Sequence, residues 1–375
     1  MAAQPDDGAG RCTGEGGMNT HDMTASAPAL PKIIEGQRYT SPQRDVGFDG
    51  MVFTDCHFDH VEWTGCRLSN LRFVNCTFDA NRFDHCDLLA VAHDACRIRS
   101  GASTHCALER VSYSECEIED GAWTGSLLRD SIVTHSTGMN WTFDGMRGAH
   151  FSLVTSRLDG LALLGGHWSD TAWIDSQLAG LRIENARLEN FIVGQSTAVR
   201  TSLSGCHGIN VRWIGSRIED LAIDRCDLRQ AAWSHSTWRS GEIRACQLAL
   251  ASFDCSALDG LTVTQSDFSQ AIFDNAHITD SEFPELHAPR IALRDAWLTR
   301  VNFAGAQLRQ IDARGASLEE VGLHGADCRD GNLLGQPRVA WRAADTRNAN
   351  FDEAIGADEQ LWRRRHQPGA RKYDD

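Results

Sequence analysis

Apolar residues recur at every fifth position over most of this chain. The frame starts at Phe53, Phe58 and Trp63 and is still in step at Phe303 and Leu308. An α-helix needs an apolar period near 3.6 residues and a strand needs a period of 2, so a period of five fits neither as a continuous stretch. The pattern instead predicts a solenoid, in which each short segment turns one corner of a coil.

A second set of inward positions lies two residues before each apolar one. One half of this set holds small residues, such as Cys56 and Ser136, and the other half often holds aliphatic residues, such as Val61. Four pentads would close one square coil, so residues twenty apart would stack at the usual strand spacing of about 4.8 Å. Between residues 47 and 337 this arrangement predicts about 14 coils and a rod about 70 Å long.

Several pentads combine a small residue, a polar residue, a central Leu or Phe and two polar residues. They include 301–305 (Val-Asn-Phe-Ala-Gly), 306–310 (Ala-Gln-Leu-Arg-Gln), 316–320 (Ala-Ser-Leu-Glu-Glu) and the partial copy 349–351. In these residues the chain resembles the pentapeptide repeat family, and the resemblance covers roughly 47–337. It implies an all-β fold, a right-handed quadrilateral β-helix.

The chain departs from the family pattern in two ways. The small position holds Cys or Ser more often than Ala, and the central position holds Trp at 63, 123, 168, 173, 213, 233 and 238. Indoles are large for a narrow bore, so we expect either wider coils or indoles that lean outward. Because most of the thirteen cysteines fall in the inward small position, we interpret them as packing residues and not as disulfide partners.

Two flanking regions lie outside the frame. Residues 1–46 are rich in Gly, Ala, Asp and Pro and are predicted to be a largely disordered arm, with a short lead-in strand at Lys32, Ile33 and Ile34. Residues 338–375 are predicted to be a C-terminal cap or tail. A short helix there would place Leu361 and Trp362 over the open end of the rod, because exposed terminal coils associate. The basic run that follows Trp362 could instead be a solvated tail.

The sequence gives no sign of targeting to a membrane. The N-terminus lacks the basic start and apolar run of a signal peptide, and no segment is long enough for a membrane span. We therefore expect a cytoplasmic protein, with export that needs no cleaved signal as an open alternative.

Candidate chemistry is sparse. His85-Cys86 and His105-Cys106 recur one coil apart, but the frame turns the thiols inward and the imidazoles outward, which spoils tetrahedral metal geometry. The chain has neither a Gly-x-Ser-x-Gly elbow nor a Gly-rich phosphate loop. We therefore expect no cofactor, no metal and no catalytic residue. An enzyme with an unrecognised site is the least favoured hypothesis.

The formal net charge of −15 raises the question of nucleic-acid mimicry. The family resemblance implies one such function, because some pentapeptide repeat proteins resemble duplex DNA and bind DNA gyrase or related topoisomerases in its place. One predicted vertical line is rich in acids: Asp59, Asp79, Glu119, Asp159, Glu219, Asp259 and Glu319. Duplex DNA, however, carries one charge per about 1.7 Å, and this rod would carry about one per coil. Arg99 and Arg239 interrupt the line, so duplex mimicry is the alternative hypothesis. Direct nucleic-acid binding is not expected, because arginines and carboxylates are intermixed.

One outer face is unusually apolar. Residues that flank the inward column through Val133 and Trp213 should point to solvent, and they include Ile132, Val154, Ile174, Ile192 and Ile214. Clustered exposed aliphatic residues usually mark an interface. Scattered surface apolar residues are the alternative explanation. We therefore expect a non-enzymatic protein–protein interaction scaffold that binds a partner or itself. The family resemblance also suggests an accessory of a bacterial type VI secretion system.

Overall fold

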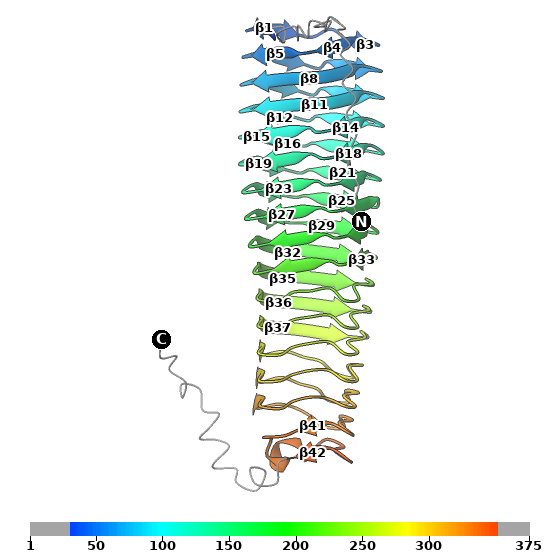
Figure 1. Cartoon of the computed structure of the whole chain (residues 1–375), viewed down its shortest axis with the longest axis vertical. Coiled ribbons are helices and arrows are strands. Elements are labelled where there is room, and N and C mark those ends of the chain that lie inside the picture. Colours follow the sequence, from blue (N-terminus) through cyan, green and yellow to red (C-terminus); the bar gives the residue numbers. More distant parts are fainter. Residues whose placement is uncertain (1–30, 352–375) are drawn as a thin grey trace, which may run out of the picture. The chain divides into compact units, whose positions relative to one another are not determined.

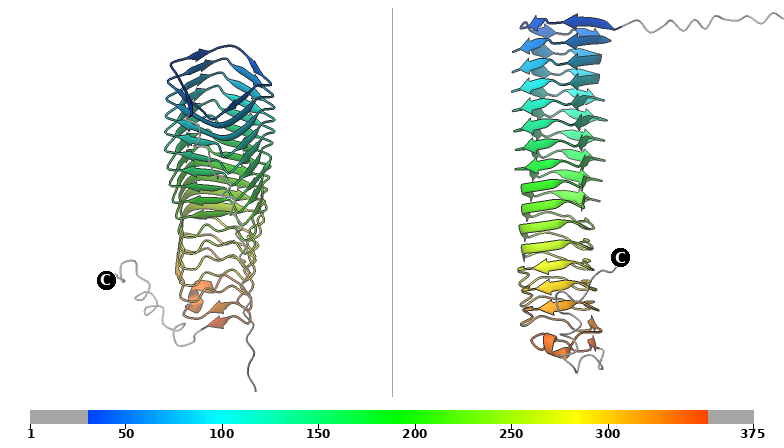
Figure 2. Two further views of the ribbon diagram at one scale, coloured as in Figure 1. Left: turned by 45° about the horizontal axis from the view of Figure 1, so that its top comes forward. Right: turned by 90° about the vertical axis from the view of Figure 1, so that its left-hand side faces the viewer.

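The computed structural model describes residues 31–351, which form a continuous rod of stacked coils (Figure 1). The rod has about 16 turns of parallel β-structure, and no α-helix occurs between residues 31 and 351. Seen obliquely from one end, each turn follows a four-sided path (Figure 2, left). The predicted all-β solenoid is therefore confirmed. No helix in the described range is long and apolar enough to cross a membrane.

We number the four sides of the rod by their inward central residues in one turn: face 1 at Phe53, face 2 at Phe58, face 3 at Trp63 and face 4 at Leu68. Each later turn adds twenty, as in the pair Phe53 and Phe73. Face 1 contains β1 (Lys32–Glu35), β5 (Met51–Thr54), β15 (Ser112–Ser114), β19 (Ile132–Thr134), β23 (Ser152–Val154), β27 (Ala172–Ile174), β31 (Ile192–Gly194), β34 (Arg212–Ile214), β41 (Asn332–Leu333) and β42 (Asn350–Phe351). Face 4 contains β4 (Gly47–Asp49), β14 (Ala107–Glu109), β18 (Leu127–Arg129), β22 (Arg147–Ala149), β26 (His167–Ser169), β30 (Arg187–Glu189) and β33 (His207–Ile209). Both β8 (Arg67–Val74) and β11 (Asp87–Asp94) run over faces 4 and 1.

The other two faces are built in the same way. Face 2 contains β2 (Arg38–Tyr39), β6 (His57–Asp59), β9 (Thr77–Asp79), β12 (Arg97–Arg99), β16 (Glu117–Glu119), β20 (Thr137–Met139), β24 (Arg157–Asp159), β28 (Gln177–Ala179), β38 (His277–Thr279), β39 (Trp297–Thr299) and β40 (Ser317–Glu319). Face 3 contains β3 (Gln43–Arg44), β7 (Glu62–Thr64), β10 (Arg82–Asp84), β13 (Ala102–Thr104), β17 (Ala122–Thr124), β21 (Thr142–Asp144), β25 (Ala162–Leu164) and β29 (Arg182–Glu184). Four longer strands run over faces 2 and 3: β32 (Thr197–Ser204), β35 (Arg217–Asp224), β36 (Thr237–Arg244) and β37 (Ala257–Thr264).

The coils extend beyond the predicted limits of 47 and 337. At the start, β1, β2 and β3 already pair with β5, β6 and β7, so Lys32 begins the first coil. At the end, β42 pairs with β41 after a 3-10 helix at Arg338–Trp341. Trp341 is buried against the last apolar layer. The guanidinium of Arg338 stacks on Phe351, with its Cζ atom 4.3 Å from the centre of the ring. The predicted cap residues Leu361 and Trp362 lie outside the described residues.

The bore is filled by stacked side chains, and all the central tryptophans point inward. Trp168, Trp173 and Trp213 are almost fully buried. Glycine makes the room for at least one of them: a Cβ at Gly148 would lie 2.2 Å from the ring of Trp168, one coil further along the same column. The alternative that indoles lean outward was therefore wrong: the central indoles are buried, and Gly148 in the adjacent coil makes room for Trp168.

Candidate interaction surface

The structure brings the five predicted aliphatic residues together on the outer side of face 1. One column contains Val154, Ile174 and Ile214, with Gly194 between the last two, and the register pairs these residues directly. The neighbouring column contains Ile132 and Ile192, separated by Ser152 and Ala172. Ile132 and Ile214 are each 38% exposed, and the three others are half-buried. We call this set of five residues the apolar face.

The apolar face is flat and almost uncharged. The side chain of Ile174 lies over the backbone of Gly194. A Cβ atom added at Gly194 would be 3.1 Å from the Cδ1 atom of Ile174. From Ser112 to Ser234, the outward positions of face 1 carry a single charged side chain, Arg212. A β-surface without charges has little to keep it in water, so this stretch is suited to contact with another apolar surface.

A ladder of polar corner residues borders the apolar face. His150 lies between two aspartates, with its Nδ1 atom 2.8 Å from Asp130 and its Nε2 atom 3.7 Å from Asp170. Asn190 donates a hydrogen bond to Asp170 at 2.8 Å, and Asn210 donates one to Asn190 at 2.7 Å. Sequence reasoning missed this ladder, although the twenty-residue spacing of its members was visible. It gives the apolar face a polar rim, as protein interfaces commonly have.

Ion pairs cover much of the surface elsewhere. On face 2, Arg97 and Glu117 of adjacent coils pair at 2.6 Å, and this hydrogen bond lowers the pKa of the Glu117 carboxyl. In a later corner, Arg300 pairs with Asp280 at 2.5 Å and lowers the pKa of that aspartate in the same way. Exposed pairs of this kind contribute little to stability, because water screens both charges. Their effect here is to keep these faces hydrated and charged, unlike the apolar face.

The predicted acidic column also forms a single line, on face 2, but its charges are partly neutralised. Asp59 contacts His60 at 2.6 Å and Arg38 at 2.8 Å, and these two hydrogen bonds lower its pKa. Glu119 lies 3.3 Å from Arg99, and Glu219 lies 3.5 Å from Arg217. Asp159 is 4.0 Å from Arg200, and Asp259 accepts a hydrogen bond from Thr279 at 2.9 Å. Asp79 and Glu319 complete the line, with Thr299 next to Glu319.

The interior offers little space for a substrate. Cavities in the bore have volumes of about 10 and 50 Å³, and aromatic and aliphatic side chains line most of their walls. The thiols of Cys86 and Cys106 are buried, whereas His85 and His105 in the adjacent corners are exposed. Among residues 31–351 the cysteines are unpaired, and Cys255 is the exposed one.

These features define a β-solenoid whose distinctive parts lie on its surface. Residues 296–333 match the family model described as "Pentapeptide repeats", in eight copies. The repeat in this segment is thus that of the pentapeptide repeat proteins, and the resemblance inferred from the sequence is confirmed. Pentapeptide repeat proteins are generally non-enzymatic. No curated protein shows a significant match to this sequence.

Several solved structures are similar to this chain at low identity. HetL, a pentapeptide repeat protein involved in heterocyst differentiation regulation from Nostoc sp. strain PCC 7120, is 15% identical over 76% of this chain and 89% of its own, with a TM-score of 0.25. QnrB1, a plasmid-mediated fluoroquinolone resistance protein, is 14% identical over 61% of this chain and 98% of its own, with a TM-score of 0.20. Rfr23 from the cyanobacterium Cyanothece 51142 is 13% identical over 38% of this chain and 88% of its own, with a TM-score of 0.15. Likenesses at this level carry no functional argument.

Proposed function

We propose that this protein is a non-enzymatic interaction scaffold of the cytoplasm, and that its apolar face packs against the same face of a second copy. The observation that carries the proposal is the stretch of face 1 in which Arg212 is the single outward charge and Ile132, Val154, Ile174, Ile192 and Ile214 are gathered. Two such surfaces bring few charges together, since Arg212 is the one charged side chain on their outward positions, and β-sheets pack face to face at about 10 Å. The contact would be isologous, with the same patch on both chains.

The size of the stretch sets the expected strength of the contact. From Ser112 to Ser234 it rises over six coil spacings, or about 30 Å, and three residues across a side span about 10 Å. Each copy therefore offers roughly 300 Å², less than half of the 800 Å² per partner in a standard interface. We expect a weak dimer that depends on concentration, in which the polar rim of Asp130, His150 and Asp170 adds contacts at the edge.

Sedimentation velocity of the purified chain over a range of concentrations tests the proposal. Ile174→Asp and Ile214→Asp should each weaken the dimer at least about tenfold, because each buries a carboxylate in the contact. The matched control is Ile209→Asp, which changes an exposed isoleucine on face 4 and should leave the dimer intact. A wild-type chain that stays monomeric at every concentration would contradict the proposal, as would equal effects of all three substitutions.

Duplex mimicry of a topoisomerase substrate is the second candidate. Its support is the alignment of seven carboxylates on face 2, and the arginines paired with them weaken it. A gyrase supercoiling assay tests it directly, because a duplex mimic should inhibit supercoiling at micromolar concentration.

No particular residue supports a role in type VI secretion, which stays a prediction from the family resemblance.

A further inference from the structure

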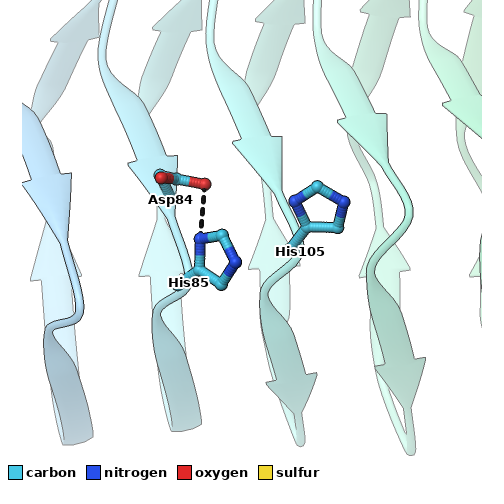
Figure 3. A group of neighbouring side chains, drawn as sticks. All are labelled: Asp84, His85 and His105. Atoms are coloured by element: carbon cyan, nitrogen blue, oxygen red, sulfur yellow. Dashed lines mark hydrogen bonds and ion pairs between the residues drawn. The ribbon is translucent and has the colours of Figure 1, made fainter.

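A cluster of metal-ligating side chains lies on the corner between faces 3 and 4. Asp84 ends strand β10, His85 forms the corner that follows, and His105 forms the same corner one coil further on (Figure 3). The Nδ1 atom of His85 is 2.8 Å from an Asp84 carboxylate oxygen, and the two imidazole rings lie 5.1 Å apart. One donor atom from each of the three residues lies within 4.8 Å of the others.

The backbone explains why the two imidazoles meet. His85 and His105 have φ angles of 52° and 51°, the left-handed conformation that turns each corner. Their side chains leave the coil in the same direction, and Figure 3 shows a ring nitrogen of each on the side of the other. The corner one coil further on is Gly125, where a Cβ would lie 3.1 Å from the ring of His105. The pair therefore faces an open hollow of about 340 Å³, which Asp87 and Arg147 also line.

We propose that Asp84, His85 and His105 bind a divalent transition-metal ion such as Zn²⁺. Two imidazoles and one carboxylate are a donor set that zinc accepts, and a tetrahedral ion would keep its fourth position for water or for a side chain of another protein. The side chains of His85 and Asp84 are 66% and 49% exposed, so they can rotate to close the remaining distance to the ion. The hollow beside them leaves room for the fourth ligand.

This site differs from the one that the sequence analysis considered and rejected. There, Cys86 and Cys106 were the assumed partners of the two histidines, and the structure buries both thiols inside the bore. The third donor is instead the carboxylate of Asp84, on the outer side of the strand before the corner. The expectation of no metal site was argued from the thiols and did not consider Asp84.

The chain contains its own control for this arrangement. Asp59 and His60 form the same aspartate–histidine corner, with 2.6 Å between Oδ1 and Nδ1. One coil further on, however, that corner holds Ala80, so the second imidazole is missing. Ala80 has a φ angle of 48°, close to the values of His85 and His105, so a histidine can be placed there without changing the backbone. Ala80→His, made together with Arg38→Ala because Arg38 holds the Asp59 carboxylate at 2.8 Å, should therefore create a second site of the same kind.

Calorimetric titration with Zn²⁺ tests the proposal on the full chain carrying Cys255→Ser. That substitution removes the thiol from another group of neighbouring donors, His235, Asp254 and Cys255. In this background, we expect His105→Ala to lose one equivalent of zinc or to bind it at least about tenfold more weakly. Residues that only hold a metal ligand in place already change the affinity by about tenfold or more when they are replaced, and His105 is proposed as a ligand itself. His60→Ala should bind zinc like the parent, and Ala80→His with Arg38→Ala should bind one equivalent more.

Two results would overturn the proposal: unchanged stoichiometry and affinity in His105→Ala, or no additional binding by Ala80→His with Arg38→Ala. Circular dichroism of each variant shows whether it keeps the β-fold, so a loss of binding caused by unfolding is recognised. The site does not depend on the proposed dimer, since face 1 contains none of its ligands.

Discussion

The two halves of the rod close the same coil with different corners. Before about residue 227, the side chain of the inward small residue often accepts a hydrogen bond from a backbone N–H of the previous coil. For example, the N–H of Cys116 donates to Oγ of Ser136, one coil further on, at 3.0 Å. After residue 227 many corners close with a turn of their own, in which the N–H of Ala306 donates to the carbonyl of Phe303 at 3.0 Å. A corner N–H must find an acceptor in either case, and the acceptor differs between the halves.

This difference explains where the family resemblance is strongest. The matched segment 296–333 lies in the second half, where alanines such as Ala296, Ala306 and Ala316 fill the small position. In the first half the same position holds mainly Cys and Ser, whose side chains bond to the backbone. Two kinds of corner can therefore support one coil geometry, and a family pattern based on alanine detects only one of them.

Both halves stack aromatic residues in the bore, and the first half also places a tryptophan next to a glycine. In the first half, Trp168 lies over Gly148, so a very large residue is balanced by the smallest one. In the second half, Phe253 and Phe273 stack at 4.6 Å, and alanines such as Ala276 occupy the small positions. The first half contains aromatic stacks as well, such as Phe53 and Phe73 at 5.0 Å, so the packing that depends on one particular pair is that of Trp168 and Gly148.

The largest expected effect follows from that pairing. Trp168→Ala should destabilise the rod by about 3–5 kcal/mol, because it leaves a cavity in the bore. Gly148→Leu alone should also destabilise it, by about 1–3 kcal/mol, because the bore is already full. Combined with Trp168→Ala, however, Gly148→Leu should restore stability, since the leucine fills the cavity. Urea denaturation followed by circular dichroism measures all three variants, and additive losses in the double variant would contradict the paired packing.

Acid should weaken the first half through His93, which is buried between the rings of Phe73 and Tyr113. Burial lowers the pKa of His93 to about 4, from an ordinary value near 6.5. Because the folded state disfavours the charged form, its contribution is complete above about pH 6.5 and is lost as the pH falls towards 4. The loss should reach about 3 kcal/mol.

His93→Phe would continue the aromatic stack without an ionisable group and should remove this acid sensitivity. Urea denaturation of both chains at several pH values between 7 and 4 measures the difference. Parallel pH profiles for the wild type and His93→Phe would show that His93 is not the cause.

A smaller effect is expected at the corners. Ser136→Ala removes the acceptor for the N–H of Cys116 and should cost about 1–2 kcal/mol, as expected for a buried donor left unpaired. Ser114→Ala, on the outer side of face 1, is the control and should change stability by less than about 0.5 kcal/mol. A cost for Ser136→Ala no larger than that of the control would contradict this expectation. It would show that the corner can adopt the turn of the second half and that the two kinds of corner are interchangeable.

The smallest effect concerns thiol reactivity. Iodoacetamide should modify Cys255 in the native protein and spare buried thiols such as Cys106. Desolvation and the neighbouring Asp254 raise the pKa of the Cys255 thiol, so its labelling should be slow and should speed up with pH. Mass spectrometry of peptides from the labelled protein identifies the modified residues. Equal labelling of Cys106 would show that the first half opens readily.

Much of this structure could be predicted from the five-residue frame, because the frame fixes which side chains point inward. The frame placed Ile174 and Ile214 on one face and Asp59 and Asp79 on one line. It could not place the first coil, because Ile34 pairs with Phe53 at a spacing of nineteen residues. It also missed Trp341, the last residue of a 3-10 helix that breaks the frame at the end of the rod.

The side-chain clusters at the corners were not predicted from the sequence, for a different reason. Asp130, His150 and Asp170 have the twenty-residue spacing of stacked positions, as do His85 and His105. Sequence reasoning treated the corner positions as generic solvent-facing residues and compared each histidine with its neighbour in sequence. The contacts that matter run along the rod, between residues that are far apart in the chain.

Disulfide cross-linking of variants with one introduced cysteine tests the functional claim most directly. Ala172 lies at the middle of the stretch of face 1 from Ser112 to Ser234, and Ala292 occupies the same column in the second half of the rod. In a chain that carries Cys255→Ser, oxidation of Ala172→Cys should give a covalent dimer, because this residue lies at the centre of the proposed contact. Ala292→Cys should stay monomeric. Equal yields from the two variants, or no dimer from Ala172→Cys, would contradict self-association through the apolar face.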